Sequence, residues 1–353
     1  MARIDLEDIA HRYGTDMWAL QPMNMTWTDG GAYALLGPSG CGKTTLLNII
    51  SGLVTPTRGT VRFDGRDVTS LQPEARNIAQ VFQFPVVYDT MTVFENLAFP
   101  LRNRGWRADA LERRVQQVAE ILDLTTQLGQ RARSISADQK QKISLGRGLV
   151  RPDVAAVLFD EPLTVIDPAL KWLLRRKLKQ IHHDLKLSLI YVTHDQTEAL
   201  TFADQVVVMS QGEVVQIGTA EALFEAPAHR FVGHFIGTPG MNFLSCAWTN
   251  GASIAGVPVA TSSSQTPPSG ATLSIGVRPE YLQLAHAPGP NRIPATVVAV
   301  RDQGTDAMVR LEIAGATAWA KLRSERPLPS CGPAYVWLPP ERCALYADDR
   351  RVA

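Results

Sequence analysis

The chain has few cysteines, and their arrangement indicates neither a disulfide framework nor a metal site. Only four occur among 353 residues, they form no C-x-x-C pair, and no histidine cluster lies near them in the sequence. We therefore expect free thiols in a reducing compartment. The four are Cys41, Cys246, Cys331 and Cys343.

The chain also lacks the net charge that would attract a large polyanion. Lys and Arg total 35 against 34 Asp and Glu, which leaves a formal charge of +1. Nucleic acid is therefore not expected as a partner, and any anion site must be local. The length allows two domains, or one large domain with an appendage.

Targeting and membrane-spanning segments are not expected either. The first eight residues carry acids and no apolar core, unlike a signal peptide. Residues 241–277 contain no charged residue, but they are rich in Gly, Ser, Thr and Pro. A bilayer helix needs about 20 predominantly apolar residues, so we expect a loop within a β-rich region. We expect a soluble, cytosolic chain.

A phosphate-binding loop is the strongest positive signal. Residues 37–45 fit the pattern G-x-x-x-x-G-K-[ST] without a mismatch, between a predicted buried strand over 32–36 and a predicted helix over 44–50. Its glycines let backbone N–H groups surround a β-phosphate, Lys43 adds a charge, and Thr44 offers a hydroxyl to Mg²⁺. We infer a nucleotide-binding protein whose triphosphate lies at a helix N-terminus. The loop comprises Gly37, Pro38, Ser39, Gly40, Cys41, Gly42, Lys43, Thr44 and Thr45.

Two adjacent acids follow a second apolar run. Residues 154–159 read as a central parallel strand buried on both faces, and Asp160 and Glu161 come directly after it. Ligands of such sheets bind beyond the carboxyl ends of the strands. We expect Asp160 to hold Mg²⁺, directly or through water, and Glu161 to polarise a water for attack on the γ-phosphate. The alternative, a pair of solvated turn residues, is disfavoured by the phosphate loop.

Two further strands end in polar residues. A strand predicted over 187–193 ends at His194, and Gln83 follows the apolar residues 78–82. A lone histidine is more often a surface or core residue than a catalytic one. Because these strands belong to the same presumed sheet, we expect both side chains near the γ-phosphate.

Together these residues resemble the ATP-binding subunit of an ATP-binding-cassette (ABC) transporter, over about residues 1–235. The resemblance implies binding of ATP and Mg²⁺. It also implies a role for each residue: Tyr13 stacks on adenine, and residues 37–45 form the Walker A loop. Gln83 is the Q-loop glutamine and a metal ligand together with Thr44 and Asp160. Asp160 and Glu161 are the Walker B pair, Asp167 lies in the D-loop, and His194 is the switch histidine.

The C-terminal third extends the resemblance. Residues 235–243 and 275–280 look like the small β-barrel domain of carbohydrate importer ATPases, which serve maltose, glycerol 3-phosphate, glycerol and related polyols. Independently, residues 240–353 read as short strands separated by Pro, Gly and Asn. We expect a P-loop α/β ABC ATPase domain over 1–235, with a helical subdomain at about 85–150, and an OB/TOBE-like all-β domain over 236–353. The latter is expected to be regulatory or dimerising.

The predicted helical subdomain includes an amphipathic helix over 108–124. In the family this lobe receives the coupling helices of the membrane subunits. A surface helix packed only on its own domain would explain the same pattern.

The signature motif departs from the family. In the family, the signature Leu-Ser-Gly-Gly-Gln of one subunit completes the ATP site of another; here residues 135–139 read Ile-Ser-Ala-Asp-Gln. Ser136 and Gln139 remain, but Asp138 would place a carboxylate beside the γ-phosphate. Two unit charges 4 Å apart at an effective dielectric near 20 repel by about 4 kcal/mol, an upper bound. Rotation of the side chain, Lys140 or Lys142 would reduce this repulsion, and Asp138 could also serve as the helix N-cap.

The resemblance implies an ATPase peripheral to the cytoplasmic face of the cell membrane, driving carbohydrate or polyol import through integral-membrane permease subunits, with a solute-binding protein acting indirectly. Complete Walker residues beside an altered signature favour a heterodimer with a second ATPase; a homodimer is the alternative. Two other classes remain: a soluble cassette ATPase of DNA repair or translation, and a largely non-hydrolysing structural subunit. The first class is expected to show a long coiled-coil insertion, a tandem second cassette or a basic tail, and none is visible in this sequence. Glu161 and His194 disfavour the second class.

Overall fold

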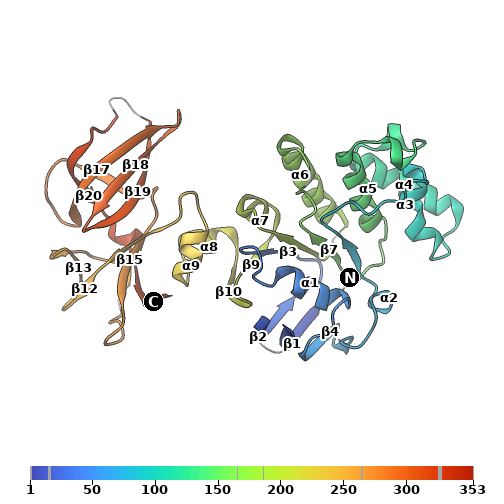
Figure 1. Ribbon diagram of the computed structural model, residues 1–353, viewed down its shortest axis with the longest axis horizontal. Coiled ribbons are helices and arrows are strands. Elements are labelled where there is room, and N and C mark those ends of the chain that lie inside the picture. Colours follow the sequence, from blue (N-terminus) through green and yellow to red (C-terminus); the bar gives the residue numbers. More distant parts are fainter. Residues whose placement is uncertain are drawn as a thin grey trace. The chain divides into compact units, whose positions relative to one another are not determined.

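The computed structural model describes residues 2–14, 17–164, 166–185, 187–263, 265–324 and 328–352. The chain divides into two compact units, Met1–Ala220 and Glu221–Ala353. The first combines sheets and helices and the second is mainly β, in agreement with the predicted fold class (Figure 1). Within the described residues, no helix has the length and apolar character needed to cross a membrane.

A six-stranded sheet in the order β10-β9-β3-β8-β7-β6 forms the centre of the first unit. Its strands run parallel except β10, which pairs antiparallel at one edge. Strands β3 and β8 are buried along their whole length, as their continuous apolar sequences predict. The strands are β3 (Ala32–Leu36), β6 (Ala79–Val81), β7 (Val157–Asp160), β8 (Leu189–Thr193), β9 (Gln205–Ser210) and β10 (Glu213–Gly218). Helices α1 (Lys43–Ser51), α6 (Pro168–Leu185) and α7 (Gln196–Phe202) belong to the same unit.

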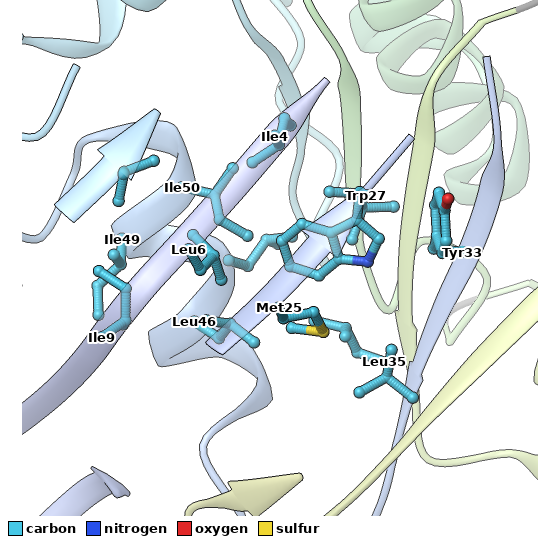
Figure 2. Packing of buried hydrophobic residues seen from close by; sticks show 14 of the residues in the cluster. Ile4, Leu6, Ile9, Met25, Trp27, Tyr33, Leu35, Leu46, Ile49 and Ile50 are labelled. Atoms are coloured by element: carbon cyan, nitrogen blue, oxygen red, sulfur yellow. The ribbon is translucent and has the colours of Figure 1, made fainter. Parts of the chain in front are cut away.

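A second, antiparallel sheet in the order β2-β1-β4-β5 packs with α1. Apolar side chains of β1, β2, β3 and α1 meet in one buried cluster (Figure 2). This cluster holds α1, the helix that begins at the phosphate loop, against both sheets. The strands are β1 (Ile4–Tyr13), β2 (Met17–Trp27), β4 (Arg58–Phe63) and β5 (Arg66–Asp67).

Three helices form a lobe with its own core. In α4, Leu111, Val115 and Val118 recur at helical spacing and are buried in the lobe's apolar cluster. This helix ends at Ile121 rather than at 124, and Asp123, two residues further on, takes a left-handed φ of 53° that no helix continues. The helices are α3 (Val93–Arg102), α4 (Ala108–Ile121) and α5 (Ala137–Leu149), and the short α2 (Pro73–Arg76) precedes them.

The described residues of the second unit form three antiparallel sheets, with one large apolar core and a smaller apolar cluster. Their orders are β11-β15-β21-β22, β12-β13-β14 and β16-β20-β17-β18-β19. The charge-free residues 241–277 were expected to form a loop within a β-rich region; the described part of this segment instead includes five short strands. The strands are β11 (Asn242–Ser245), β12 (Ala247–Trp248), β13 (Ala252–Ile254), β14 (Val257–Pro258), β15 (Leu273–Val277), β16 (Gln283–Ala285), β17 (Arg292–Asp302), β18 (Asp306–Ile313), β19 (Ala316–Arg323), β20 (Gly332–Trp337), β21 (Ala344–Ala347) and β22 (Arg350–Arg351).

Helices α8 (Ala220–Glu225) and α9 (Arg230–Phe235) group with the β unit, whereas the sequence-based boundary at residue 235 placed them in the first domain. Arg278 is the physical reason. Its buried guanidinium donates to the carbonyl oxygens of Phe224 at 3.0 Å and Gly233 at 2.9 Å, and to that of Ile236. The same group lies 4.2 Å from the centre of the Phe224 ring. One side chain from the β unit therefore satisfies carbonyls near the ends of both helices.

Candidate nucleotide site

The predicted Walker residues, Gln83 and His194 gather at the carboxyl edge of the parallel sheet. The phosphate loop follows β3, Gln83 lies two residues after β6, Asp160 ends β7 and His194 follows β8. A cavity of about 370 Å³ opens there, lined by Tyr13, the loop and Glu161. Its lining residues are Tyr13, Ala19, Ser39, Gly40, Gly42, Lys43, Thr44, Thr45 and Glu161.

Glycines shape the phosphate loop for two different reasons. Gly40 and Gly42 have φ of 79° and 101°, a region that side chains rarely adopt. A Cβ on Gly42 would also lie 2.6 Å from the carbonyl oxygen of Ala19. Gly37 has no room for a Cβ, which would approach the carbonyl oxygen of Met209 to 2.3 Å. The loop therefore depends on close approach to neighbouring strands as well as on left-handed backbone.

The start of α1 provides a positive environment. Lys43 is buried, and its Nζ donates to the carbonyl oxygens of Gly37 at 2.8 Å and Pro38 at 2.9 Å. No acidic residue occurs in the first turn of α1, so no carboxylate there repels an anion. The ammonium group, the helix N-terminus and the glycine-formed cradle together fit a triphosphate.

Thr44 and Asp160 link the loop to the end of β7. The Thr44 hydroxyl donates to Asp160 Oδ1 at 3.2 Å. Burial raises the pKa of the Asp160 carboxyl, and the hydrogen bond from Thr44 opposes this shift; nearby Glu161 raises the pKa further and Lys43 lowers it. Two hard oxygen donors beside the phosphate loop fit Mg²⁺.

Three side chains from separate segments contact the Glu161 carboxylate. His194 Nδ1 lies 3.1 Å from Oε1, while Gln83 Nε2 lies 3.4 Å and Thr164 Oγ1 3.3 Å from Oε2. The backbone of Glu161 has a left-handed φ of 46°, and its N–H donates to the carbonyl oxygen of Val192 in β8 at 3.0 Å. Sequence reasoning missed Thr164, for which a hydroxyl three residues after Glu161 was the available signal.

Tyr13 lies at the end of β1, beside the loop. Its side chain is 58% exposed, its hydroxyl is 3.5 Å from Thr45 Oγ1, and its ring meets that of His11 edge-on at 4.6 Å. Met17 and Trp18 are also exposed at this edge, where they pair with Tyr13 and Arg12.

The signature segment forms the N-terminus of α5. Ser136 is the N-cap in a capping box: its hydroxyl accepts from the Gln139 N–H at 3.5 Å, and its own N–H donates to Gln139 Oε1 at 3.2 Å. Asp138 lies in the first helical turn and accepts a hydrogen bond from the Ser136 hydroxyl. The alternative that Asp138 is the N-cap is therefore wrong, because α5 already begins at Ala137.

The two lysines considered as counter-charges for Asp138 pair elsewhere. Lys140 Nζ contacts Asp89 at 2.8 Å and Lys142 Nζ lies 4.0 Å from Asp123. Among the described residues, no cation lies within ion-pair distance of Asp138, and neither Ser136 nor Gln139 lines the phosphate-loop cavity. Asp167 precedes α6, and its carbonyl oxygen accepts the N–H of Lys171 at 3.0 Å.

A parallel sheet with a phosphate loop after one strand and a carboxylate pair after another defines a P-loop nucleotide-binding protein. Comparisons narrow the class: residues 20–164 match the ABC transporter family model and residues 275–345 match the TOBE domain model. The sn-glycerol-3-phosphate import ATP-binding protein UgpC of Chromohalobacter salexigens is 39% identical over 332 residues, covering 92% of this chain and 88% of that protein. Its counterpart from Pectobacterium atrosepticum is 36% identical over 345 residues, covering 96% and 95%.

Solved structures share the fold of the first unit. The structure of cbiO1 from Clostridium perfringens, part of the ABC transporter complex cbiONQ, has a TM-score of 0.58 at 24% identity, covering 63% of this chain and 90% of that chain. An ATP-binding cassette of an ABC transporter in its ADP conformation has a TM-score of 0.55 at 23% identity, covering 64% and 96%.

The chain belongs to the ATP-binding proteins of ABC transporters, in the group of import ATPases with a C-terminal TOBE domain. The resemblance and the fold class expected from the sequence are confirmed. The expectation that the chain is an ATPase, which binds ATP and acts with a membrane permease, is also confirmed.

Proposed function

We propose that this chain hydrolyses ATP to power the import of a polyol, a polyol phosphate or a related carbohydrate. Relatives at 36–41% identity are named sn-glycerol-3-phosphate import ATP-binding proteins, which makes glycerol 3-phosphate the first solute to test. The observation that carries the hydrolytic part is the Glu161 carboxylate, contacted by His194, Gln83 and Thr164 at the edge of the phosphate-loop cavity.

The phosphate loop would bind the triphosphate through its backbone N–H groups and Lys43. Thr44, Asp160 and Gln83 would hold Mg²⁺, which neutralises phosphate charge when bound. The hydrogen bond between Thr44 and Asp160 supports this proposal, because it brings two of the three oxygen-bearing side chains together before any ligand is considered. Tyr13 would stack on adenine, which its exposed ring at the rim of the cavity supports.

Glu161 would act as the general base on the attacking water. Its two carboxylate oxygens have different neighbours: His194 meets Oε1, and Gln83 and Thr164 meet Oε2. Contacts on both oxygens restrict rotation of the carboxylate and so orient the lone pair that accepts a proton. His194 and Gln83 would also sense the γ-phosphate.

Ser136 and Gln139 would serve a second ATP site rather than this one. They lie at the N-terminus of a helix, an end that favours an anion supplied by a facing subunit. We propose a second ATPase subunit as that partner, with a homodimer as the alternative. The assembly would lie peripherally on the cytoplasmic face of the membrane, contact the permease through the helical lobe, and receive solute indirectly from a binding protein.

Reconstitution in lipid vesicles with the permease and solute-binding protein tests this function. We expect glycerol 3-phosphate to stimulate ATP hydrolysis, Lys43→Ala to abolish it, and Glu161→Gln to lower it by about 10²- to 10⁴-fold while ATP still binds. Glu213→Gln makes the same chemical change at an exposed edge-strand residue and is expected to behave as wild type.

Three results would contradict the proposal in different ways. Near-normal turnover in Glu161→Gln would remove that residue from the mechanism. Hydrolysis that no carbohydrate, polyol or polyol phosphate stimulates would refute the transport assignment. A wild-type complex that binds ATP without hydrolysing it would instead support a non-hydrolysing structural subunit, which the altered residue Asp138 favours.

A further inference from the structure

Glu198 is a buried acid that the proposed mechanism does not use. Its side chain is only 5% exposed, yet it lies in α7, four residues after His194. An unpaired carboxylate in such a place is strongly unfavourable, so its partners indicate why it is tolerated. They come from two other elements, β8 and α6.

One carboxylate oxygen of Glu198 accepts two hydroxyl hydrogen bonds from β8. Tyr191 donates to Oε2 at 3.0 Å and Thr193 donates to the same atom at 2.9 Å. The other oxygen, Oε1, lies 3.8 Å from Nζ of Lys171 in α6. Both oxygens therefore have partners, and the negative charge has a cation beside it.

The turn that carries His194 is tied to this carboxylate. Thr193 immediately precedes His194, and its hydroxyl also accepts from the Asp195 N–H at 3.0 Å. Asp195 in turn caps α7 by accepting from the N–H groups of Thr197 and Glu198 at 2.7 and 3.2 Å. The residues on both sides of His194 are thus held, while the His194 side chain itself is 54% exposed.

We infer that Glu198 is a positioning residue for His194. Its carboxylate holds the Thr193 hydroxyl, this bond sets the direction of the turn, and the turn places Nδ1 of His194 3.1 Å from Glu161. The inference rests on the proposed role of His194 in hydrolysis.

The structure offers a matched pair of variants. Thr193→Val and Tyr191→Phe each remove one hydroxyl donor from the same oxygen of Glu198, but only Thr193 adjoins His194. In the reconstituted transporter complex, we expect Thr193→Val to lower kcat by about tenfold or more with the KM for ATP unchanged, because small displacements of a reacting group cost much of the rate. Tyr191→Phe should keep kcat within about twofold of wild type, since Glu198 keeps Thr193 and Lys171.

A double-mutant cycle tests whether Thr193 acts through Glu198. Glu198→Met removes the acceptor at similar length and is expected to show the same fall in kcat at unchanged KM. Because both changes break one contact, the double variant Thr193→Val/Glu198→Met should lose no more activity than Glu198→Met alone. Thermal unfolding of each variant is measured in parallel, and the fall in kcat should not follow the loss of stability.

The outcomes separate this inference from the proposed function. Equal losses of kcat in Thr193→Val and Tyr191→Phe, additive losses in the double variant, or wild-type kcat in Glu198→Met would each overturn the positioning role. His194→Ala is assayed alongside. If it retains wild-type turnover, the proposed role of His194 fails and the inference with it; if it is inactive while Thr193→Val is normal, only the inference fails.

Discussion

Asp160 illustrates how a single residue of this site sets function against stability. It ends a buried strand, and burial raises the pKa of its carboxyl above the ordinary 3.8. Burial therefore disfavours the ionised carboxylate in the ligand-free chain, although a metal ligand must be ionised. A group of this kind contributes stability below its ordinary pKa, and this contribution is lost as the pH rises through the folded-state pKa.

Asp160→Asn should consequently stabilise the ligand-free chain at neutral pH while preventing Mg²⁺-dependent hydrolysis. The amide is neutral at every pH and still accepts the Thr44 hydroxyl. Thermal unfolding should give the variant the higher midpoint at pH 7, with the difference shrinking as the pH falls toward 3.8. Asp67→Asn is the control of opposite sign, because hydrogen bonds from Thr69 lower the pKa of Asp67. A lower midpoint for Asp160→Asn at pH 7 would contradict the burial argument.

Tyr13 provides a second test at the residue scale. Its ring is exposed at the rim of the cavity and supported edge-on by His11, so stacking on adenine needs only an aromatic face. Tyr13→Phe should be mild, and Tyr13→Ala should raise the KM for ATP by about fivefold to a hundredfold, on the scale of base stacking. Fluorescent-nucleotide titration measures the affinities directly. Equal affinities of all three proteins would exclude stacking.

At the scale of the element, helix stability and ATP binding place conflicting demands on position 138, at the N-terminus of α5. An acid in the first turn of a helix is favourable for the helix, by about 0.3–1 kcal/mol at an exposed site. Asp138 occupies such a position, next to the Ser136 cap. In an assembled transporter the same helix end would face the triphosphate of a second subunit, where an unneutralised carboxylate is repulsive.

Asp138→Asn and Asp138→Gly should therefore each lower the stability of the chain and raise its ATPase activity. Both are expected to lower the unfolding midpoint slightly, Gly more than Asn because of its backbone entropy. Both should raise turnover at the site facing α5, by about tenfold if only a third of the 4 kcal/mol upper bound is realised. ATPase assays of the assembled complex at saturating and limiting ATP provide the measurement. An unchanged rate in both variants would refute the charge argument.

At the scale of the whole molecule, the chain carries one complete half-site and one altered half-site. The Walker residues and His194 gather around the cavity, whereas Asp138 stands at α5 without a counter-ion among the described residues. A homodimer would repeat the altered signature in both of its ATP sites. A heterodimer would leave one site with the complete Walker residues of this chain and a signature from its partner.

Expression of this chain alone and with a candidate second ATPase tests that arrangement. We expect the mixture to form a one-to-one complex by native mass spectrometry and to hydrolyse ATP faster than the sum of the separate proteins. Glu161→Gln in this chain should remove most of that activity, because the site facing Asp138 is the slower one. A vigorous homodimer whose rate is insensitive to Asp138→Gly would refute both the charge argument and the heterodimer.

Much of the site could be predicted because its residues follow predictable strands. The phosphate loop, Asp160, Glu161 and His194 each follow an apolar run, and parallel strands bring their carboxyl ends to one edge. Thr164, Glu198 and Lys171 could not be predicted in the same way. Their parts depend on which side chain meets which oxygen across a turn or between two helices, and no sequence spacing specifies that.

The sequence by itself determined the kind of chemistry and the order of the elements. A G-x-x-x-x-G-K-[ST] loop between a strand and a helix indicates phosphate binding, and continuous apolar residues indicate the buried strands. Only the tertiary structure decided the rest. It showed Ser136 rather than Asp138 as the cap of α5, paired Lys140 and Lys142 with distant aspartates, and grouped α8 and α9 with the β unit through Arg278. The cap of α5 depends on the local backbone geometry at Ser136, which the residue types alone do not fix. Ion pairing and burial of a guanidinium depend on distances between segments far apart in the chain, which packing alone sets.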